Sequence, residues 1–201
     1  MKKAVVLSAL VSLTTVTPLA AQFGPVEQPP QTWASGWLGG YLDPGTVRDP
    51  EDGAWSFGSS FAAGLGLHRQ IGNSLSIGVD ASYAPMRFEQ RDVATEEVLS
   101  SGTARVISAM ASARLRYGGG DAFGMYLTGG VGTMAYGMPD PVDRWDTDLA
   151  LHTGAGLEYR PSINRALFVE WGRYWTFHQN EGIDDNTTQH SQLRIGVRTG
   201  F

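Results

Sequence analysis

Apolar and polar positions alternate along most of this chain, from Trp55 to the C-terminal residue. Between Phe61 and Leu67, and again between Leu193 and Phe201, the odd positions are mostly apolar, whereas the even positions are mostly Gly, Ala or Arg. A period of two is typical of β-strands that have one apolar and one polar face. Because the polar face carries arginine and much glycine, we predict a β-barrel whose apolar face is turned outward to lipid.

The alternation predicts eight strands, at 33–42, 54–69, 75–86, 103–117, 122–136, 148–160, 166–177 and 190–201. Short connections that contain Gly, Asn, Pro or Ser, the residues of tight turns, fall at 70–74, 118–121 and 161–165. Long connections fall at 43–53, 87–102, 137–147 and 178–189. Short turns on one side and long loops on the other are typical of outer-membrane barrels. We therefore expect an all-β protein, an eight-stranded antiparallel up-and-down transmembrane β-barrel with both chain ends in the periplasm.

Aromatic residues at odd positions gather near the predicted strand ends. Those near the short turns and chain ends are Trp33, Trp37, Tyr117, Phe123, Tyr159 and Phe201, and those near the long loops are Tyr41, Trp55, Phe57, Tyr83, Trp175 and Phe177. Two such belts are expected at the two membrane–water interfaces. Arg173 breaks the outward pattern, but it lies near the outer end of its strand, where a long side chain can snorkel. The alternative is a soluble barrel of lipocalin type, which would have to enclose all these rings in one narrow lumen.

The N-terminal residues predict export. Lys2 and Lys3 precede an apolar run at 4–13, and small residues at 19–21 fit a cleavage site. The apolar run is shorter than the roughly 20 residues of a transmembrane helix. We expect three regions: a signal peptide at 1–21, a Pro-rich periplasmic lead-in at 22–32 and the transmembrane β-barrel domain at 33–201. The chain has no cysteine, so backbone pairing and packing must hold the exported protein together.

The distribution of charge along the chain limits the classes of partner that we expect. The 201 residues carry a formal net charge of −5 without a basic stripe, which argues against nucleic acid. In chain order the four long connections carry net charges of −3, −2, −2 and −3. Clustered carboxylates favour hard divalent ions, which would bridge these loops to lipopolysaccharide phosphates or to a surface partner. The alternative is that the loops are simply solvated. The sequence has no metal-ligand cluster, phosphate loop or dinucleotide fingerprint, and we expect no cofactor.

The final segment, QLRIGVRTGF at 192–201, resembles the C-terminal signal of small outer-membrane barrels of the OmpA-transmembrane-domain and OmpX type. The resemblance extends over about 33–201. It implies that the barrel-assembly machinery reads an assembly signal made of Leu193, Ile195, Val197 and Phe201. It also implies a porin-like protein in the outer membrane of a Gram-negative-type bacterium, in contact with outer-membrane lipid and lipopolysaccharide and with a surface ligand or host partner. The family contains structural proteins, adhesins, evasion factors and a few enzymes, so the resemblance implies fold and location but no single activity.

The inward-facing charges form the candidate site. We predict a lumen ion-pair network made of Asp80, Arg114, Arg116, Glu158, Glu170, Arg194 and Arg198. Buried charges are costly unless they are paired, and an eight-stranded barrel is just wide enough to be filled by its side chains. The pairs therefore favour a plug. The alternative is a gate, in which switching pairs would open a narrow ion channel.

A lipid A-modifying enzyme is the third hypothesis, because His178, Glu181, His190 and Ser191 lie near the last long connection. Barrel deacylases of this size place their His and Ser two residues apart on one strand. Here His190 and Ser191 are adjacent, so a strand would turn them to opposite faces. We therefore expect a non-catalytic protein, without catalytic or metal-ligating residues. It would be a structural or surface-interaction protein that displays four acidic extracellular loops over a plugged polar lumen.

Overall fold

The computed structural model describes residues 31–42, 46–49, 53–92, 94–117, 122–138, 145–177 and 187–201. The predicted signal peptide and nearly all of the lead-in lie outside the described residues and stay predictions. The strands are β1 (Thr32–Leu42), β2 (Thr46–Asp49), β3 (Gly53–Phe57), β4 (Ser60–Ile71), β5 (Leu75–Arg91), β6 (Val98–Tyr117), β7 (Phe123–Gly137), β8 (Trp145–Ser162), β9 (Arg165–Phe177) and β10 (Thr187–Gly200). The described residues contain no apolar helix of membrane-spanning length.

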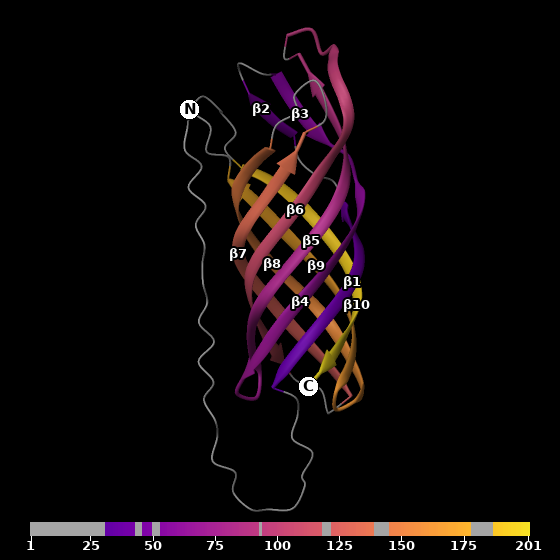
Figure 1. The fold of residues 1–201 in the computed structure, drawn as a ribbon, viewed down its shortest axis with the longest axis vertical. Helices are drawn as coiled ribbons and strands as arrows, with labels where there is room; N and C mark the ends of the chain where they lie inside the picture. Colours follow the sequence, from indigo (N-terminus) through magenta and orange to yellow (C-terminus); the bar gives the residue numbers. More distant parts are fainter. Residues whose placement is uncertain are drawn as a thin grey trace, which may run out of the picture.

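Eight of these strands, β1 and β4 to β10, form a closed antiparallel barrel (Figure 1). Each pairs with the barrel strands before and after it in the chain, and β1 pairs with β10 from Trp33 opposite Gly200 to Leu42 opposite Ser191. Closure gives every barrel strand two partners, so the wall has no open edge. The predicted eight-stranded antiparallel barrel is confirmed. Its short-turn end carries the C-terminus, and its opposite, long-loop end carries β2 and β3 (Figure 1).

Beyond the long-loop end the chain is more ordered than the sequence pattern predicts. The predicted strand 54–69 is interrupted at Gly58 and Ser59, and both of its parts, β3 and β4, pair with β5. The predicted loop 43–53 contains β2, and most of the predicted loop 87–102 is strand. We call β2, β3 and the paired outer ends of β5 and β6 the outer sheet; it rises above the barrel (Figure 1). β3 keeps the alternation with bulky apolar residues, but β2 and the outer ends of β5 and β6 lose it, because no face of these segments has to meet lipid.

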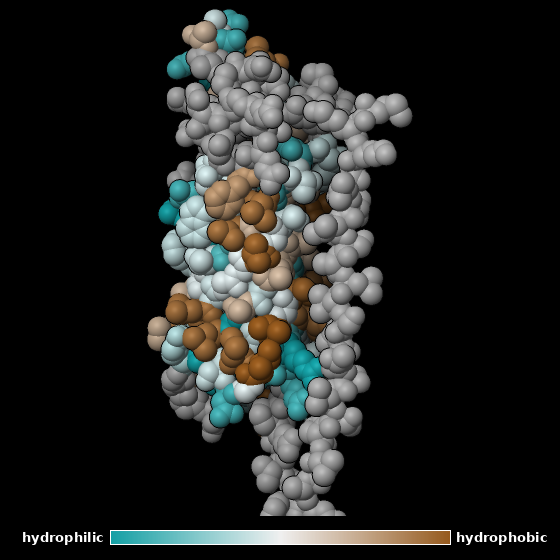
Figure 2. Space-filling view, turned by 90° about the vertical axis from the view of Figure 1, so that its left-hand side faces the viewer, coloured by the Kyte–Doolittle hydropathy of each residue, from teal (hydrophilic) through white to brown (hydrophobic). Residues whose placement is uncertain are grey.

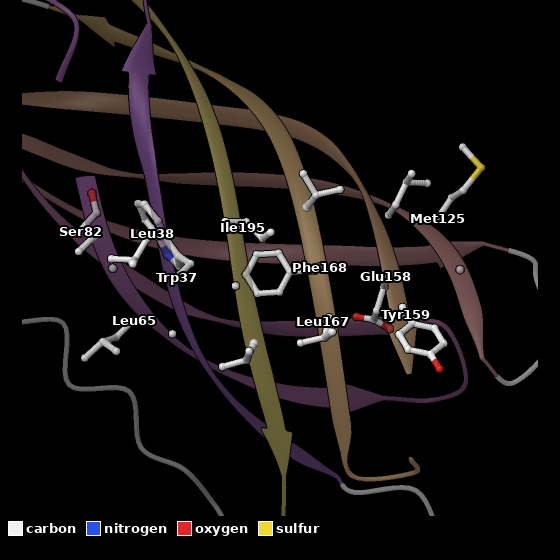
Figure 3. Close-up of a pocket in the computed structure, with 18 of the residues that line it drawn as sticks. Trp37, Leu38, Leu65, Ser82, Met125, Glu158, Tyr159, Leu167, Phe168 and Ile195 are labelled. Atoms are coloured by element: carbon white, nitrogen blue, oxygen red, sulfur yellow. The ribbon is translucent and has the colours of Figure 1, made fainter. Parts of the chain in front are cut away.

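The apolar face points outward in β4 to β10, as predicted. Leu65 and Ile195 are 69% and 66% exposed, and hydrophobic residues gather in patches on the face of the barrel wall that Figure 2 shows. Neighbouring residues alternate between the two sides of the wall, as with buried Phe168 and exposed Leu167, both labelled in Figure 3. The hollow in Figure 3 is lined mainly by apolar residues of the wall, the surface that acyl chains contact. A soluble barrel with its apolar face inward is therefore the wrong alternative.

Two strands have the opposite parity, and here the predicted aromatic belts are wrong. Some of the aromatic residues predicted for the belts instead face inward and are buried, namely Trp33, Trp37, Tyr41, Trp55 and Phe57. Alternation fixes the two faces within one strand, but each connection resets which face turns inward. The irregular residues 58–59 reverse the parity between β3 and β4. The belt prediction holds for exposed members such as Tyr83, Tyr117 and Phe123.

Glycines make room for the inward rings. A Cβ atom added to Gly64 would meet the indole of Trp37, and one added to Gly196 would meet Trp37 and Phe168. Gly156 faces the ring of Tyr126 in the same way. The lumen is therefore filled by large side chains that lie against glycines of the facing or neighbouring strands, which is how a narrow barrel interior can be packed.

Candidate functional site

One group of charges in the lumen surrounds Glu170 of β9, whose side chain is 1% exposed. Its carboxylate oxygens lie 2.5 Å from Nη2 of Arg194 and 3.5 Å from Nη2 of Arg114. Nε2 of His152 is 3.8 Å away. Arg194 is the direct cross-strand neighbour of Glu170 on β10, whereas Arg114 reaches it from β6 across the barrel interior. One buried carboxylate is thus shared by two buried guanidinium groups.

A second group surrounds Glu158 of β8 toward the short-turn end. Nε of Arg160 lies 2.6 Å from Oε1 of Glu158, and Nε of Arg116 lies 3.5 Å from the same oxygen. Arg198 of β10 donates from Nη1 to the other oxygen, Oε2. Arg160 was not among the residues predicted for the network, although its even position in the strand predicted at 148–160 indicates an inward side chain.

Two aromatic rings lie between these groups. The guanidinium carbon of Arg114 is 4.4 Å from the ring centroid of Tyr126, and that of Arg198 is 5.0 Å from the same centroid. Arg198 also lies 4.6 Å from the centroid of Phe168. Cations over ring faces are attracted by the ring quadrupole, and more strongly when they are desolvated. Neither Tyr126 nor Phe168 was predicted at this site, because the predicted belts contain only odd-numbered aromatic residues, whereas both of these rings occupy even, inward positions.

Asp80 of β5 contacts a histidine and a serine. Nε2 of His68 is 3.2 Å from Oδ2 of Asp80, and Oγ of Ser112 donates to the same oxygen at 2.5 Å. His68 and Ser112 are themselves 2.9 Å apart. The structure therefore places Asp80 in a polar triad on the neighbouring strands β4 and β6, where short side chains and an imidazole complete its hydrogen bonds.

The outer half of the lumen is mostly apolar. Tyr41, Met86, Phe88, Met134 and Tyr136 are all less than 2% exposed. His190 is buried among them, with Nε2 3.0 Å from the hydroxyl of Tyr136.

Ser191 is only partly buried on the opposite face of β10 from His190, so these two side chains do not meet in one site. His178 and Glu181 lie outside the described residues. In the described part of the chain, no group of three or more His, Asp or Glu side chains is placed to hold a metal ion. Most of the acidic loop residues fall outside that part.

The C-terminal segment lies on the outside of the wall. Leu193, Ile195, Val197 and Phe201 are exposed outward. The backbone of Phe201 exchanges hydrogen bonds with that of Thr32, at 3.0 and 3.3 Å, so the last residue helps to close the barrel. The recognition of these residues by the assembly machinery stays a prediction.

The turn between β5 and β6 is organised by one carboxylate outside the membrane. Oδ1 of Asp92 accepts hydrogen bonds from the backbone N–H groups of Ala94 and Thr95, both at 2.8 Å, and from the Thr95 hydroxyl at 3.1 Å. The backbone N–H of Thr95, then that of Ala94, lowers the pKa of Asp92 below its ordinary value of 3.8. The outer sheet therefore ends in a turn that is stabilised by an ionised aspartate.

A closed eight-stranded barrel with apolar residues outside, charges inside and short turns at one end is the architecture of outer-membrane barrel proteins. A family model described as "Outer membrane protein beta-barrel domain" matches residues 6–201. The chain belongs to this family, which places it in the outer membrane of Gram-negative bacteria, in contact with membrane lipid and lipopolysaccharide. That the short-turn end is periplasmic and the long-loop end extracellular stays a prediction.

Two solved structures illustrate the likeness. Neisserial surface protein A superposes with a TM-score of 0.61 at 15% identity, over 87% of this chain and 100% of that one. OprG from Pseudomonas aeruginosa superposes with a TM-score of 0.57 at 13% identity, over 86% of this chain and 97% of that one. No curated protein matches the sequence. At these identities the likeness shows the shared fold alone.

Proposed function

We propose that this protein is a non-catalytic surface-interaction barrel: a closed transmembrane scaffold that presents the outer sheet and its acidic loops to partners outside the cell. The observation that carries the proposal is the combination of a filled lumen with a rigid extracellular sheet. Function built on loops above a rigid scaffold is common. The barrel supplies the anchor, and the outer sheet supplies the contact surface.

The filled lumen supports a plug rather than a pore. Glu170 and Glu158 hold arginines from three different strands, and Tyr41, Tyr136 and Met134 pack above them. Opening a path would require breaking buried ion pairs, which costs several kcal/mol for each uncompensated charge, about 3–5 kcal/mol. The described side chains therefore favour an ion-pair network with a structural role.

The outer sheet supports an interaction role. β5 and β6 continue far beyond the barrel, and β3 and β2 add to the side of β5 (Figure 1). Val98 and Leu99, at the tip of this sheet, are 52% and 57% exposed. Successive residues of a strand point to opposite faces, so each face of the tip presents one apolar side chain to a partner.

A non-catalytic role is supported by the surroundings of His190. Its imidazole lies inside the aromatic and methionine packing, beside the Tyr136 hydroxyl, while Ser191 belongs to the other face of the wall. A nucleophile and its base need to lie within hydrogen-bonding reach of each other. Mass spectrometry of lipid A from cells with and without the protein tests this point; a changed acyl composition would support the lipid A-modifying enzyme instead.

Planar-bilayer recording tests the plug. The full-length protein, reconstituted from detergent, should give no reproducible conductance steps in potassium chloride. As a matched comparison, Tyr41→Ala with Tyr136→Ala removes two rings from the outer lumen and should create small conductance steps. Reproducible steps from the unmodified protein would refute the plug and favour the narrow gated ion channel.

Photo-crosslinking in intact cells tests the interaction role. A photoreactive amino acid at Leu99 should capture protein or glycan partners when cells are exposed to host extracellular material. The same group at Asn73, in the periplasmic turn, is the matched control and should capture neither. If the Leu99 probe captures no protein or glycan from either host material or the cell envelope, the interaction role is wrong.

A further inference from the structure

A small, partly open cavity of about 30 Å³ lies at the periplasmic mouth of the barrel. Four arginines line it, together with the polar groups of Gln70, Asn73 and Ser76 and one carboxylate. The arginines are Arg114, Arg116, Arg160 and Arg198, and the carboxylate is Glu158. A cavity of this size holds about two water molecules or one small inorganic ion.

The charges around the cavity do not balance. Arg160 and Arg198 both contact Glu158, and Arg114 and Arg194 both contact Glu170, so each glutamate faces two guanidinium groups even with Arg116 left aside. Asp80 supplies one further negative charge, beside His68. Arg116 is a fifth arginine of the lumen, and Asp148, buried toward the long-loop end, is a fourth carboxylate. The described lumen therefore keeps one positive charge in excess, and an uncompensated buried charge is costly.

Arg198 lines the cavity and carries hydrogen-bond donors that the described residues leave unused. Its side chain is only 6% exposed, and within the described residues Nε and Nη2 have no hydrogen-bond partner. Nη1 alone is engaged, by Glu158. Nε of Arg114, which lines the same cavity, also has no partner there. Guanidinium N–H groups require acceptors, and the strongest acceptors are anions.

We propose that this cavity is a binding site for a small inorganic anion, such as chloride or inorganic phosphate, held by Arg198 and Arg114 with the polar groups of Ser76 and Gln70. The anion supplies the missing negative charge and accepts the unused N–H groups. The site closes the periplasmic end of the lumen electrostatically, as the aromatic and methionine packing closes the extracellular end sterically. The proposal does not depend on the surface-interaction role, because it concerns the opposite end of the barrel.

Anion-dependent stability tests the proposal. The refolded protein in detergent micelles is unfolded with urea in sodium chloride, sodium phosphate or sodium gluconate at one ionic strength; gluconate is too large for the cavity. The unfolding midpoint should rise saturably with chloride or phosphate and stay at its lowest value in gluconate, since a ligand that binds only the folded state stabilises it. The anion that reaches half of its stabilising effect at the lower concentration is the preferred ligand.

Three variants separate binding from general salt effects. Arg198→Gln should abolish the difference between the anions, whereas Arg165→Gln, an exposed arginine at the same end and outside the cavity, should keep it. Ser76→Asp places a carboxylate in the cavity. The urea midpoint of this variant in gluconate should therefore rise toward the wild-type value in chloride, and it should not rise further when chloride or phosphate is added. This variant keeps the test informative if Arg198→Gln fails to fold.

Crystals soaked in sodium bromide give a direct readout. An anomalous peak beside Arg198 is the expected result. Equal midpoints in all three salts, or an anion response that survives both Arg198→Gln and Ser76→Asp, would overturn the proposal, as would soaked crystals with no bromide peak in the cavity.

Discussion

Replacing Glu170 with Gln should strongly destabilise the barrel. The glutamate lies 2.5 Å from Arg194 and 3.5 Å from Arg114, and all three side chains are 6% exposed or less. The amide keeps the shape but removes the charge, which leaves two guanidinium groups in the lumen without their counter-charge. Removing one partner of a buried pair costs about 3–5 kcal/mol. With a urea dependence of about 1–3 kcal/mol per molar, the unfolding midpoint should fall by roughly 1–5 M.

The assay is urea unfolding of the refolded protein in micelles, followed by tryptophan fluorescence, with the heat-modifiable shift on gels to confirm that each variant is folded. Glu89→Gln is the matched control, because Glu89 pairs with Arg87 and Arg91 on the exposed part of β5; its midpoint should not change. Glu170→Gln combined with Arg194→Met should recover part of the loss, because it removes both charges of the closest pair. A midpoint for Glu170→Gln equal to that of wild type would refute the reasoning and place the carboxylate in water.

Three further results are expected. Deleting Phe201 should reduce assembly in cells, seen as loss of the heat-modifiable band, because the backbone pairing of the last residue and the predicted assembly signal are both removed; a normal band would contradict the signal. The lowered pKa of Asp92 stabilises the β5–β6 turn at pH above the ordinary value of 3.8, and this is lost as pH falls through the lowered pKa. Protection of the Thr95 amide from hydrogen exchange, after correction for the intrinsic rate, should drop in acid, but not in Asp92→Asn; a drop of equal size in both would exclude the carboxylate as the cause. Gly156→Val should lower stability by about 1–3 kcal/mol through a clash inside the lumen, whereas Gly129→Val on the lipid side should be tolerated, and equal effects would argue against the assigned faces.

The sequence by itself determined the architecture and its location. A period of two identifies strands, and the alternation of short and long connections orders them into an up-and-down barrel. Charges restricted to one face can only point away from acyl chains, so the inward direction of Glu170 and Arg194 follows from local pattern. To predict that these two residues pair directly, one needs in addition only the register between the neighbouring strands β9 and β10.

Only the tertiary structure decided the features that depend on closure. Each connection resets the parity, so the inward position of Trp37 on β1 could not be read from alternation on other strands. Contacts across the lumen, such as Arg114 with Glu170 or Arg198 over Tyr126, depend on the stagger of all eight strands. The pattern indicated β3 but not β2 or the outer ends of β5 and β6. Above the membrane neither face meets lipid, so these segments form strands by pairing with their neighbours and show no alternation with bulky apolar residues.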